Sequence, residues 1–577
     1  MGVRLQLLAG LGCIACATGL PQPGPVFGQP DAEPAAAATG AGGVLDGDAS
    51  LGVVADLVLG VLGDGVAEAG DGYGGDGAGD VEERFMDQRV DHFNRQESRT
   101  FPQRYFINRR YWAKSIDNAP VFLCIGGEGP ALDASVLSAS VHCNDMLELA
   151  PKHHALLVAV EHRYYGKSNP FDNWETESLQ WLSSQQALAD LAAFHGYLVS
   201  VEGLNGSEKW VTWGGSYPGM LAGWARLKFP NLFHAAVSSS SPLKAKLNFP
   251  QYTELMRDSL ASDAEGVGGS EKCAKAIAKG HSSIGGLLQT QKGRLELVEI
   301  FELCDDTSLE QESARVLFAG DGVVMLPIQE NDPACNTTLC NIKAVCDVMT
   351  HNDKRSEASQ SQAFLPSAIR KIQRNLPSNG DRGHEPPSPC ESFPPSDIRD
   401  SAAGGLRGSS SLAMMSDPTD ASNPNRAWLY QTCTEFGFYQ ASHASFASSC
   451  LLTCEIGSRC PFTQGLHTLN LDLRICQEAF GIEAKHVRKQ ISYTNLYYGG
   501  RKPRGSRVIF PNGSIDPWHA LGVLESPMPE LPVIYVEGAS HHFWTHPSKP
   551  TDSSDVAKAR MEIWKQVTEW LDEDDDD

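Results

Sequence analysis

The stretch Trp210-Val-Thr-Trp-Gly-Gly-Ser-Tyr-Pro-Gly219 decides the fold. Bulky and β-branched residues predict a buried strand over 210–213, and residues 218–229 have the spacing of a helix. Ser216 lies in the glycine-rich turn between them. A sharp strand-to-helix turn lifts a serine hydroxyl above the sheet edge and places the next backbone N–H at the start of the helix. The stretch therefore predicts a nucleophilic serine.

This turn departs at one place from the strict Gly-x-Ser-x-Gly pattern. Gly214 and Ser216 fit the pattern, but position 218 is proline and the second glycine is Gly219. Gly-Ser turns also occur with a purely structural role, so the turn alone leaves both readings open. The residues that lie further along the chain decide between them.

Strands and helices alternate around the turn. Such alternation predicts a largely parallel sheet that is covered on both faces. A folded region is expected to begin near Phe85. The expected elements are strands at 121–125, 154–160, 210–213, 233–237, 507–510 and 533–536, and helices at 184–199, 218–229 and 554–571.

The pattern changes between the fourth and fifth of these strands, where helical stretches and cysteines dominate. We therefore expect an α/β sheet domain that is split by a large, mostly helical cap inserted between sheet strands. The expected divisions are a signal peptide at 1–28, an acidic Ala/Gly-rich low-complexity segment at 29–82, the first part of the sheet domain at 83–245, the cap at 246–480 with a disordered stretch at 353–425, the second part of the sheet domain at 481–571, and an acidic tail at 572–577.

Composition and targeting signals favour the secretory pathway. Arg4 and the apolar run 5–20 are typical of a signal peptide, and that run is too short for a comfortable membrane span. The net charge is −24, but the acidic stretches at 30–83 and 572–577 supply 18 of those charges. The mildly acidic body argues against nucleic acid or an anionic membrane as a partner.

Thirteen cysteines follow the signal peptide, and in a secreted chain they predict disulfides. Zinc is the alternative, but no Cys-x-x-Cys pair with matching histidines occurs, so no metal and no cofactor are expected. Three sequons predict glycosylation at Asn205, Asn336 and Asn512. The expected location is extracellular or a lysosome-like compartment.

A carboxylate and a histidine follow the last two predicted strands. Asp516 comes just after the strand at 507–510, and His541 and His542 come after the strand at 533–536. The order serine, acid, histidine is that of α/β hydrolases. Loops at the carboxyl ends of parallel strands are also where open α/β sheets bind ligands. We therefore predict a triad of Ser216, Asp516 and His541, with His542 as the alternative base.

The chemistry of such a triad assigns a role to each residue. A neutral imidazole takes the serine proton during attack, and the carboxylate fixes the imidazole tautomer. The oxyanion needs two donors, for which the N–H groups of Tyr217 and Gly127 are the candidates. The glycines of Gly126-Gly-Glu-Gly129 could instead have only a role in the turn.

Several blocks in order resemble one family of serine peptidases, that of prolylcarboxypeptidase, dipeptidyl peptidase II and thymus-specific serine protease. The resemblance covers roughly residues 85 to 570, except for the low-complexity insertion. The block at 430–437 is most similar to the thymus-specific branch of the family. The blocks are Asp91-His-Phe-Asn94, Glu161-His-Arg-Tyr-Tyr-Gly-Lys-Ser168, Ala187-Leu-Ala-Asp190, Gly214-Gly-Ser-Tyr217, Ala225-Arg-Leu-Lys-Phe-Pro230, Tyr430-Gln-Thr-Cys-Thr-Glu-Phe-Gly437, Asp516-Pro-Trp518 and Ser540-His541.

The resemblance implies an α/β-hydrolase domain with a helical cap that cleaves short peptides, with the family's catalytic residues on Ser216, Asp516 and His541. It also implies cleavage after proline, with Trp518 in an apolar pocket, although core packing is the alternative role for Trp518. After the histidine, family members often continue toward an acidic residue, whereas here Phe543-Trp-Thr545 follows. The pocket beside the triad is therefore expected to differ. Lysosomal members of the family retain activity in acid, so the resemblance implies that desolvation and the cap environment outweigh the carboxylate and lower the pKa of His541, leaving activity at about pH 5.5.

The function expected from the sequence is that of a serine-type exopeptidase acting through an acyl-enzyme on peptide substrates. An esterase or lipase with the same triad is one alternative, and a non-catalytic binding protein on a hydrolase scaffold is another. The sequence leaves open the end from which residues are removed. It also leaves open the oligomeric state, with a homodimer among the options.

Overall fold

The computed structural model describes residues 80–303, 328–350, 424–440 and 468–573, except for 115, 117 and 339, together with residues 306, 307, 309, 310, 315 and 318. The predicted signal peptide, almost all of the segments 29–82 and 353–425, and the end of the acidic tail lie outside the described residues. Within the described part, no helix is long and apolar enough to span a membrane.

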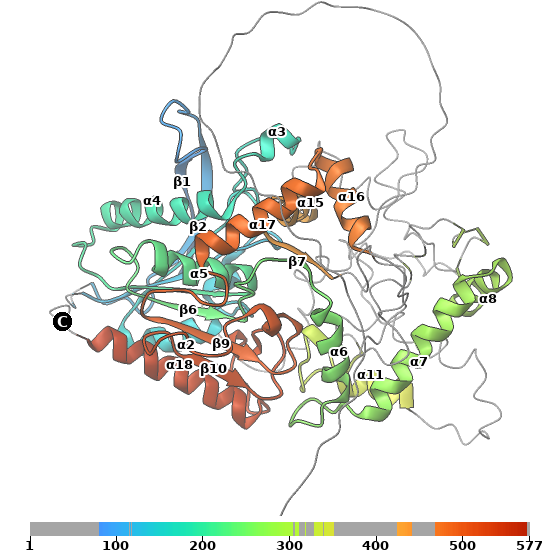
Figure 1. Ribbon diagram of the computed structural model, residues 1–577. Helices are drawn as coiled ribbons and strands as arrows, with labels where there is room; N and C mark the ends of the chain where they lie inside the picture. The colour runs from blue at the N-terminus through green and yellow to red at the C-terminus, as the bar shows by residue number, and fades with distance from the viewer. Residues whose placement is uncertain are drawn as a thin grey trace, which may run out of the picture. The chain divides into compact units, whose positions relative to one another are not determined.

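A mixed eight-stranded sheet forms the centre of the described chain (Figure 1). Strands β1 and β2 form an antiparallel pair, β2 also lies antiparallel to β4, and the other neighbours are parallel. The strand order confirms the predicted α/β-hydrolase class. In that order the strands are β1 (Val81–Arg89), β2 (Thr100–Asn108), β4 (Leu156–Val160), β3 (Val121–Ile125), β5 (Trp210–Gly215), β6 (Ala235–Ser239), β9 (Val508–Gly513) and β10 (Val533–Val536).

The central strands are apolar along their whole length because both faces of the sheet are covered. Every residue of β3 is buried. Its alternate side chains enter two separate cores, Leu123 with the helices α4 (Ser184–Glu202) and α5 (Ser216–Lys228), and Phe122 with α2 (Asn144–His153) and α18 (Ser554–Asp572). Figure 1 shows α4 and α5 on one side of the strands and α18 on the other. This is the covered sheet that the sequence predicted.

The sequence analysis did not predict the edge strand β1 or its neighbour β2. Exposed and buried residues mix along β1, so no apolar run predicts a strand there.

Two other elements begin at slightly different residues than the sequence predicted. The strand predicted at 154–160 begins at Leu156, because His154 adopts a left-handed conformation that ends α2. The helix predicted at 218 begins at Ser216.

A mostly helical insertion separates β6 from β9, as predicted. The helix α17 packs against the π-helix Thr432–Phe436 and shares a core with cap residues such as Cys433 and Cys476. The sequence had placed it in the second part of the sheet domain. The division at residue 480 therefore stays a prediction. The insertion contains α6 (Gln251–Ala261), α7 (Glu271–Leu288), α8 (Gln291–Phe301), α11 (Ile342–Thr350), α15 (Pro424–Gln431), α16 (Leu469–Phe480) and α17 (Ala484–Tyr498), with the short strands β7 (Lys246–Asn248) and β8 (Gly437–Tyr439).

Four disulfides occur among the described residues, which confirms disulfide formation. One joins β3 to the residue before α2, and the other three lie within the cap. The pairs are Cys124–Cys143, Cys273–Cys346, Cys335–Cys340 and Cys433–Cys476. The remaining cysteines of the expected mature chain lie outside the described residues.

Candidate active site

Ser216 is the first residue of α5 and directly follows β5. Its φ of 59° lies in the left-handed region, which is uncommon for a residue other than glycine. Strain of this kind persists where the surrounding structure imposes it, and it is concentrated at functional sites. The chain therefore makes the sharp strand-to-helix turn that the sequence predicted.

The close packing of this turn explains why its second glycine is displaced by one position. A Cβ on Gly214 would lie 2.4 Å from the backbone oxygen of Pro218, which forbids any side chain at 214. A Cβ on Gly219 would lie 2.7 Å from the oxygen of Ser239 and 2.8 Å from that of Gly214. The position that needs glycine is therefore 219, where helix and strands meet, whereas 218 accommodates proline.

Asp516 and His541 lie together beyond the ends of β9 and β10. Both side chains are almost completely buried. Asp516 Oδ1 accepts a hydrogen bond from the backbone N–H of Trp518 at 2.9 Å. Asp516 Oδ2 lies 2.9 Å from His541 Nδ1. The carboxylate is thus held by the turn that follows it and faces the imidazole.

Both ring nitrogens of His541 are buried, and neither forms a hydrogen bond among the described residues: Nδ1 has its close contact with Asp516, whereas Nε2 has no partner there. No hydrogen bond joins it to Ser216 in that part of the chain, a common feature of catalytic sites without substrate. The structure therefore brings the predicted acid and base into contact and leaves Nε2 available for proton transfer.

The net pKa shift of His541 is upward. Burial lowers the pKa, but the charge of Asp516 in contact with the ring, together with the charges of Glu330 and Glu128, outweighs it and raises the pKa above 6.5. The expectation that desolvation would dominate is therefore wrong. The reason is that the charges of three carboxylates act on one imidazole, and only Asp516 was identified from the sequence.

His542 has a different environment from His541. Its Nδ1 lies 3.2 Å from Thr545 Oγ1, and its backbone N–H donates to Ser240 Oγ. Burial, followed by the neighbouring His541, lowers its pKa well below 6.5. Its ring packs against the β5–α5 turn, since a Cβ on Gly215 would lie 2.8 Å from it. Asp516 forms its ion pair with His541, so the geometry favours His541 as the base.

Both predicted oxyanion residues lie beside the turn. Tyr217 occupies the first turn of α5, where backbone N–H groups have no partner within the helix. Gly127, after β3, packs against the start of the same helix, because a Cβ there would lie 2.3 Å from Pro218 Cγ. The Tyr217 hydroxyl lies 3.0 Å from His162 Nε2 and accepts a hydrogen bond from Gln431 Nε2 at 3.0 Å.

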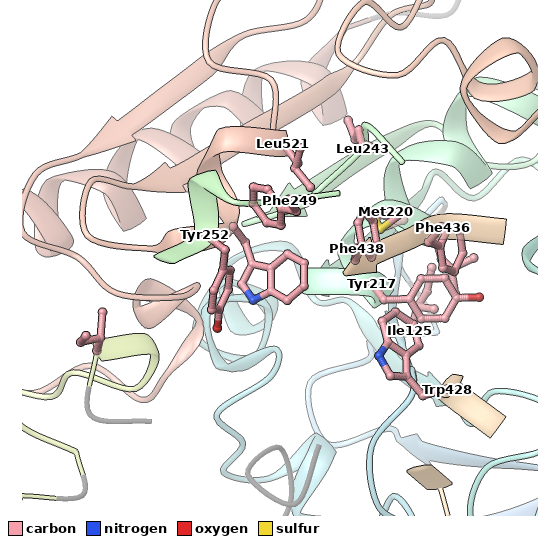
Figure 2. Packing of buried hydrophobic residues seen from close by; sticks show 14 of the residues in the cluster. Ile125, Tyr217, Met220, Leu243, Phe249, Tyr252, Trp428, Phe436, Phe438 and Leu521 are labelled. Carbon is pink, nitrogen blue, oxygen red and sulfur yellow. The ribbon is translucent and has the colours of Figure 1, made fainter. Parts of the chain in front are cut away.

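Trp518 belongs to an aromatic cluster between the sheet and the cap. Its ring packs against those of Phe249, Tyr252 and Phe438, and its indole N–H donates to Gln329 Oε1. Figure 2 shows Phe249 and Tyr252 close together on one side of this cluster, and Phe438 on the side of Tyr217 and Phe436. The ring centroid of Trp518 lies 6.3 Å from that of His541. The cluster therefore adjoins the base.

The sequence analysis missed the cap residues that contact the site. The backbone N–H of His541 donates to the oxygen of Gln329, and Ser540 Oγ donates to the oxygen of Asn331. Gln431 accepts a hydrogen bond from the Tyr165 hydroxyl in addition to its bond to Tyr217. Gln431 lies within the block 430–437 that resembles the peptidase family, so the sequence could have indicated that it belongs to the site. No pattern marks residues 329–331.

The three glycosylation sequons differ in accessibility. Asn205 and Asn336 are exposed in loops, and glycosylation there stays a prediction. Asn512 is 1% exposed within β9, and its amide nitrogen donates to the oxygens of Phe510 and Val523. A glycan attaches to that nitrogen, so the folded strand leaves no room for one. The prediction for Asn512 is wrong, because a sequon carries no information on burial.

Residues 88–563 match the family described as Serine carboxypeptidase S28. The chain belongs to this family of serine peptidases. Its relatives include the thymus-specific serine proteases of Mus musculus, 34% identical over 87% of this chain and 90% of that protein, and of Homo sapiens, 33% identical over 84% and 86%. The lysosomal Pro-X carboxypeptidase of Mus musculus is 25% identical over 84% of this chain and 88% of that protein. The predicted family is confirmed, and the protein is a serine peptidase.

Proposed function

We propose that this protein is a serine-type exopeptidase that hydrolyses short peptides through an acyl-enzyme. Ser216 is the nucleophile, His541 the general base and Asp516 the acid that orients it. The observation that supports this assignment best is the buried Asp516–His541 contact of 2.9 Å. It lies beyond the carboxyl ends of β9 and β10, in the same parallel part of the sheet as the strained Ser216 after β5.

The proposed reaction follows from this geometry. Ser216 Oγ attacks the scissile carbonyl carbon while its proton passes to His541 Nε2. The N–H groups of Tyr217 and Gly127 stabilise the negative oxygen that forms. His541 then returns the proton to the leaving amine, and the C–N bond breaks. A water molecule, deprotonated by His541, then attacks the ester carbon. The bond to Ser216 Oγ breaks, His541 returns the proton to Ser216, and the acyl product is released as a carboxylic acid.

The cap accounts for a preference for short peptides. Its segment 329–331 binds the loop that carries His541, and Gln431 binds the residue after the nucleophile. Cap residues that lie so close to the triad limit how far a substrate can extend past the scissile bond. A folded protein substrate would not reach Ser216.

Cleavage after proline is the finer specificity that we propose. The aromatic cluster around Trp518 offers apolar ring faces beside His541. A pyrrolidine ring is apolar and rigid, so it loses little entropy on binding to such a surface. A relative is named lysosomal Pro-X carboxypeptidase, which agrees with this preference.

We also place the protein in the secretory pathway, either outside the cell or in a lysosome-like compartment. Four disulfides among the described residues fit an oxidising compartment. The relative named lysosomal supports the same location.

The test of the proposed triad is labelling with a fluorophosphonate, which reacts with activated serines. Wild-type protein should be labelled, and Ser216→Ala should lose both labelling and peptide turnover, the latter by several orders of magnitude. Ser526→Ala, which removes an exposed hydroxyl, is the matched control and should behave like the wild type. If Ser216→Ala were still labelled, the nucleophile would be another residue.

A further inference from the structure

The side chain of Tyr217, the residue after the proposed nucleophile, is held at its far end by groups from two other parts of the chain. Its hydroxyl lies 3.0 Å from Nε2 of His162, in the loop after β4. The hydroxyl also accepts a hydrogen bond of 3.0 Å from Nε2 of Gln431, the last residue of the cap helix α15. The proposed mechanism uses only the backbone N–H of Tyr217, so these contacts of its hydroxyl have no assigned role.

The direction of these hydrogen bonds follows from the state of His162. Its Nδ1 lies 2.7 Å from the carbonyl oxygen of Arg163, which can only accept, so Nδ1 carries a proton. Burial lowers the pKa of the His162 ring to about 4, so above that pH the ring is neutral and Nε2 is an acceptor. The Tyr217 hydroxyl therefore donates to His162 and accepts from Gln431. Its single proton has a fixed partner, and the hydroxyl is held from both sides.

Gln431 is itself held in one orientation. Its Oε1 accepts a hydrogen bond from the Tyr165 hydroxyl at 2.7 Å. Its Nε2 donates a second, longer bond of 3.4 Å to Glu435, whose carboxyl group also accepts bonds from the backbone N–H and the hydroxyl of Ser184. All of these side chains are buried. A buried network with its polar groups paired is rigid, because releasing any member leaves a partner unsatisfied.

The ring of Tyr217 is also confined by the cap. Its centroid lies 5.6 Å from that of Trp428 and 5.4 Å from that of Phe436, and Figure 2 shows both rings beside it. Only two rotatable bonds join a tyrosine ring to its backbone, so a fixed ring and hydroxyl restrict the backbone of Tyr217. That backbone directly follows Ser216, whose φ of 59° persists only where the surroundings impose it.

We infer that Gln431 is a positioning residue of the reaction. Through its hydrogen bond to the Tyr217 hydroxyl, it holds the Tyr217 N–H at the proposed oxyanion site and Ser216 in its strained conformation. The cap thus takes part in catalysis through a residue that acts on the nucleophile turn. Because this role exists only if Ser216 is the nucleophile, it rests on the proposed function.

Two variants remove the two sides of this hydrogen bond. Tyr217→Phe deletes only the hydroxyl, and Gln431→Met keeps the length of the side chain without its polar groups. Each should lower kcat for a fluorogenic peptide amide roughly 10-fold, as for one lost hydrogen bond, which is less than the loss of a whole oxyanion donor. KM should change less than about 2-fold, because the bond acts on the transition state. The double variant should lose no more than the worse single variant, since both changes remove the same bond.

A purely structural role of the network would lower the Tm and leave kcat unchanged. The control is Tyr439→Phe, which removes another buried hydroxyl of the cap, 3.0 Å from Cys476 Sγ, and should keep the wild-type kcat. Titration with a fluorophosphonate counts the intact active sites, so kcat is obtained per folded molecule. The boronate analogue of the substrate forms an adduct with Ser216 that presents an oxygen to the same donors. Its affinity should fall in Tyr217→Phe by the same factor as kcat.

The inference is overturned if either single variant keeps the wild-type kcat, if the loss appears in KM instead, or if the two losses multiply in the double variant. An unchanged boronate affinity, or an equal loss of kcat in Tyr439→Phe, would also overturn it. The triad is tested separately, because Ser216→Ala that is still labelled would defeat the proposed function. If Ser216→Ala is not labelled and Tyr217→Phe keeps its kcat, only the role of Gln431 fails.

Discussion

The acid Asp145 should make the folded protein more stable at mildly acidic pH than at neutral pH. It is 1% exposed at the start of α2, and neither carboxylate oxygen has a hydrogen-bond partner among the described residues. Burial raises its pKa from 3.8 to about 7 and outweighs opposing effects such as the positive charge of Arg560. The folded state therefore binds a proton that the unfolded chain releases near pH 4.

The size of the effect follows from this difference in pKa. Between about pH 4 and pH 7 only the folded state holds the proton, so stability falls as the pH rises through that window. A shift of about 3 pKa units corresponds to roughly 4 kcal/mol. Asp145→Asn keeps the shape without the charge, and above pH 7 it should recover up to that amount. At pH 4 the variant and the wild type should be equally stable.

Thermal unfolding at pH 5 and pH 8 measures this effect. For a chain of this size, roughly 4 kcal/mol corresponds to a rise of about 5 °C in the Tm of Asp145→Asn at pH 8, with a much smaller difference at pH 5. Asp87→Asn neutralises an exposed aspartate on β1 and should leave the Tm unchanged at both pH values. An Asp145→Asn protein that is less stable than the wild type at pH 8 would refute the reasoning, since it would show that the charge is favourably bound.

Two further predictions concern the proposed base. His541→Ala should reduce kcat/KM by about four orders of magnitude or more, whereas His542→Ala should cost less than about 100-fold; the reverse order would move the base to His542. Because the net pKa of His541 is raised, kcat/KM should decrease as the pH falls through a value above 6.5, and Glu330→Gln should move this acid limb to lower pH. A limb near pH 5 in the wild type would contradict the electrostatics described for the site.

The parts of the fold that the sequence predicted are those with a local signal. Strands such as β3 are continuous apolar runs, and the Ser216 turn has a glycine pattern that its close packing requires. Asp516 and His541 could be predicted because each follows a strand, and parallel strands end at one edge of the sheet. Their contact then depends only on β9 and β10 being neighbours, which they are.

The missed features depend on contacts between distant segments. Glu128 and Glu330 lie about 200 residues apart in the sequence, and only folding brings both to His541. The predicted direction of the pKa shift of His541 was wrong for this reason, because the number of charges around a group depends on the fold and not on the local sequence. The prediction of glycosylation at Asn512 was wrong for the same reason. A sequon is a local pattern, whereas the burial of Asn512 in β9 depends on the fold.

The hydrogen bonds between residues 329–331 and the loop at 540–541 bear on how this enzyme could be engineered. The N–H of His541 and the hydroxyl of Ser540 both donate to main-chain oxygens of the insertion. The insertion is therefore a structural support of the loop that carries His541. A chimera in which another hydrolase supplies the cap would have to retain the segment 329–331. Without it, the loop that carries the proposed base His541 would lose these two hydrogen bonds.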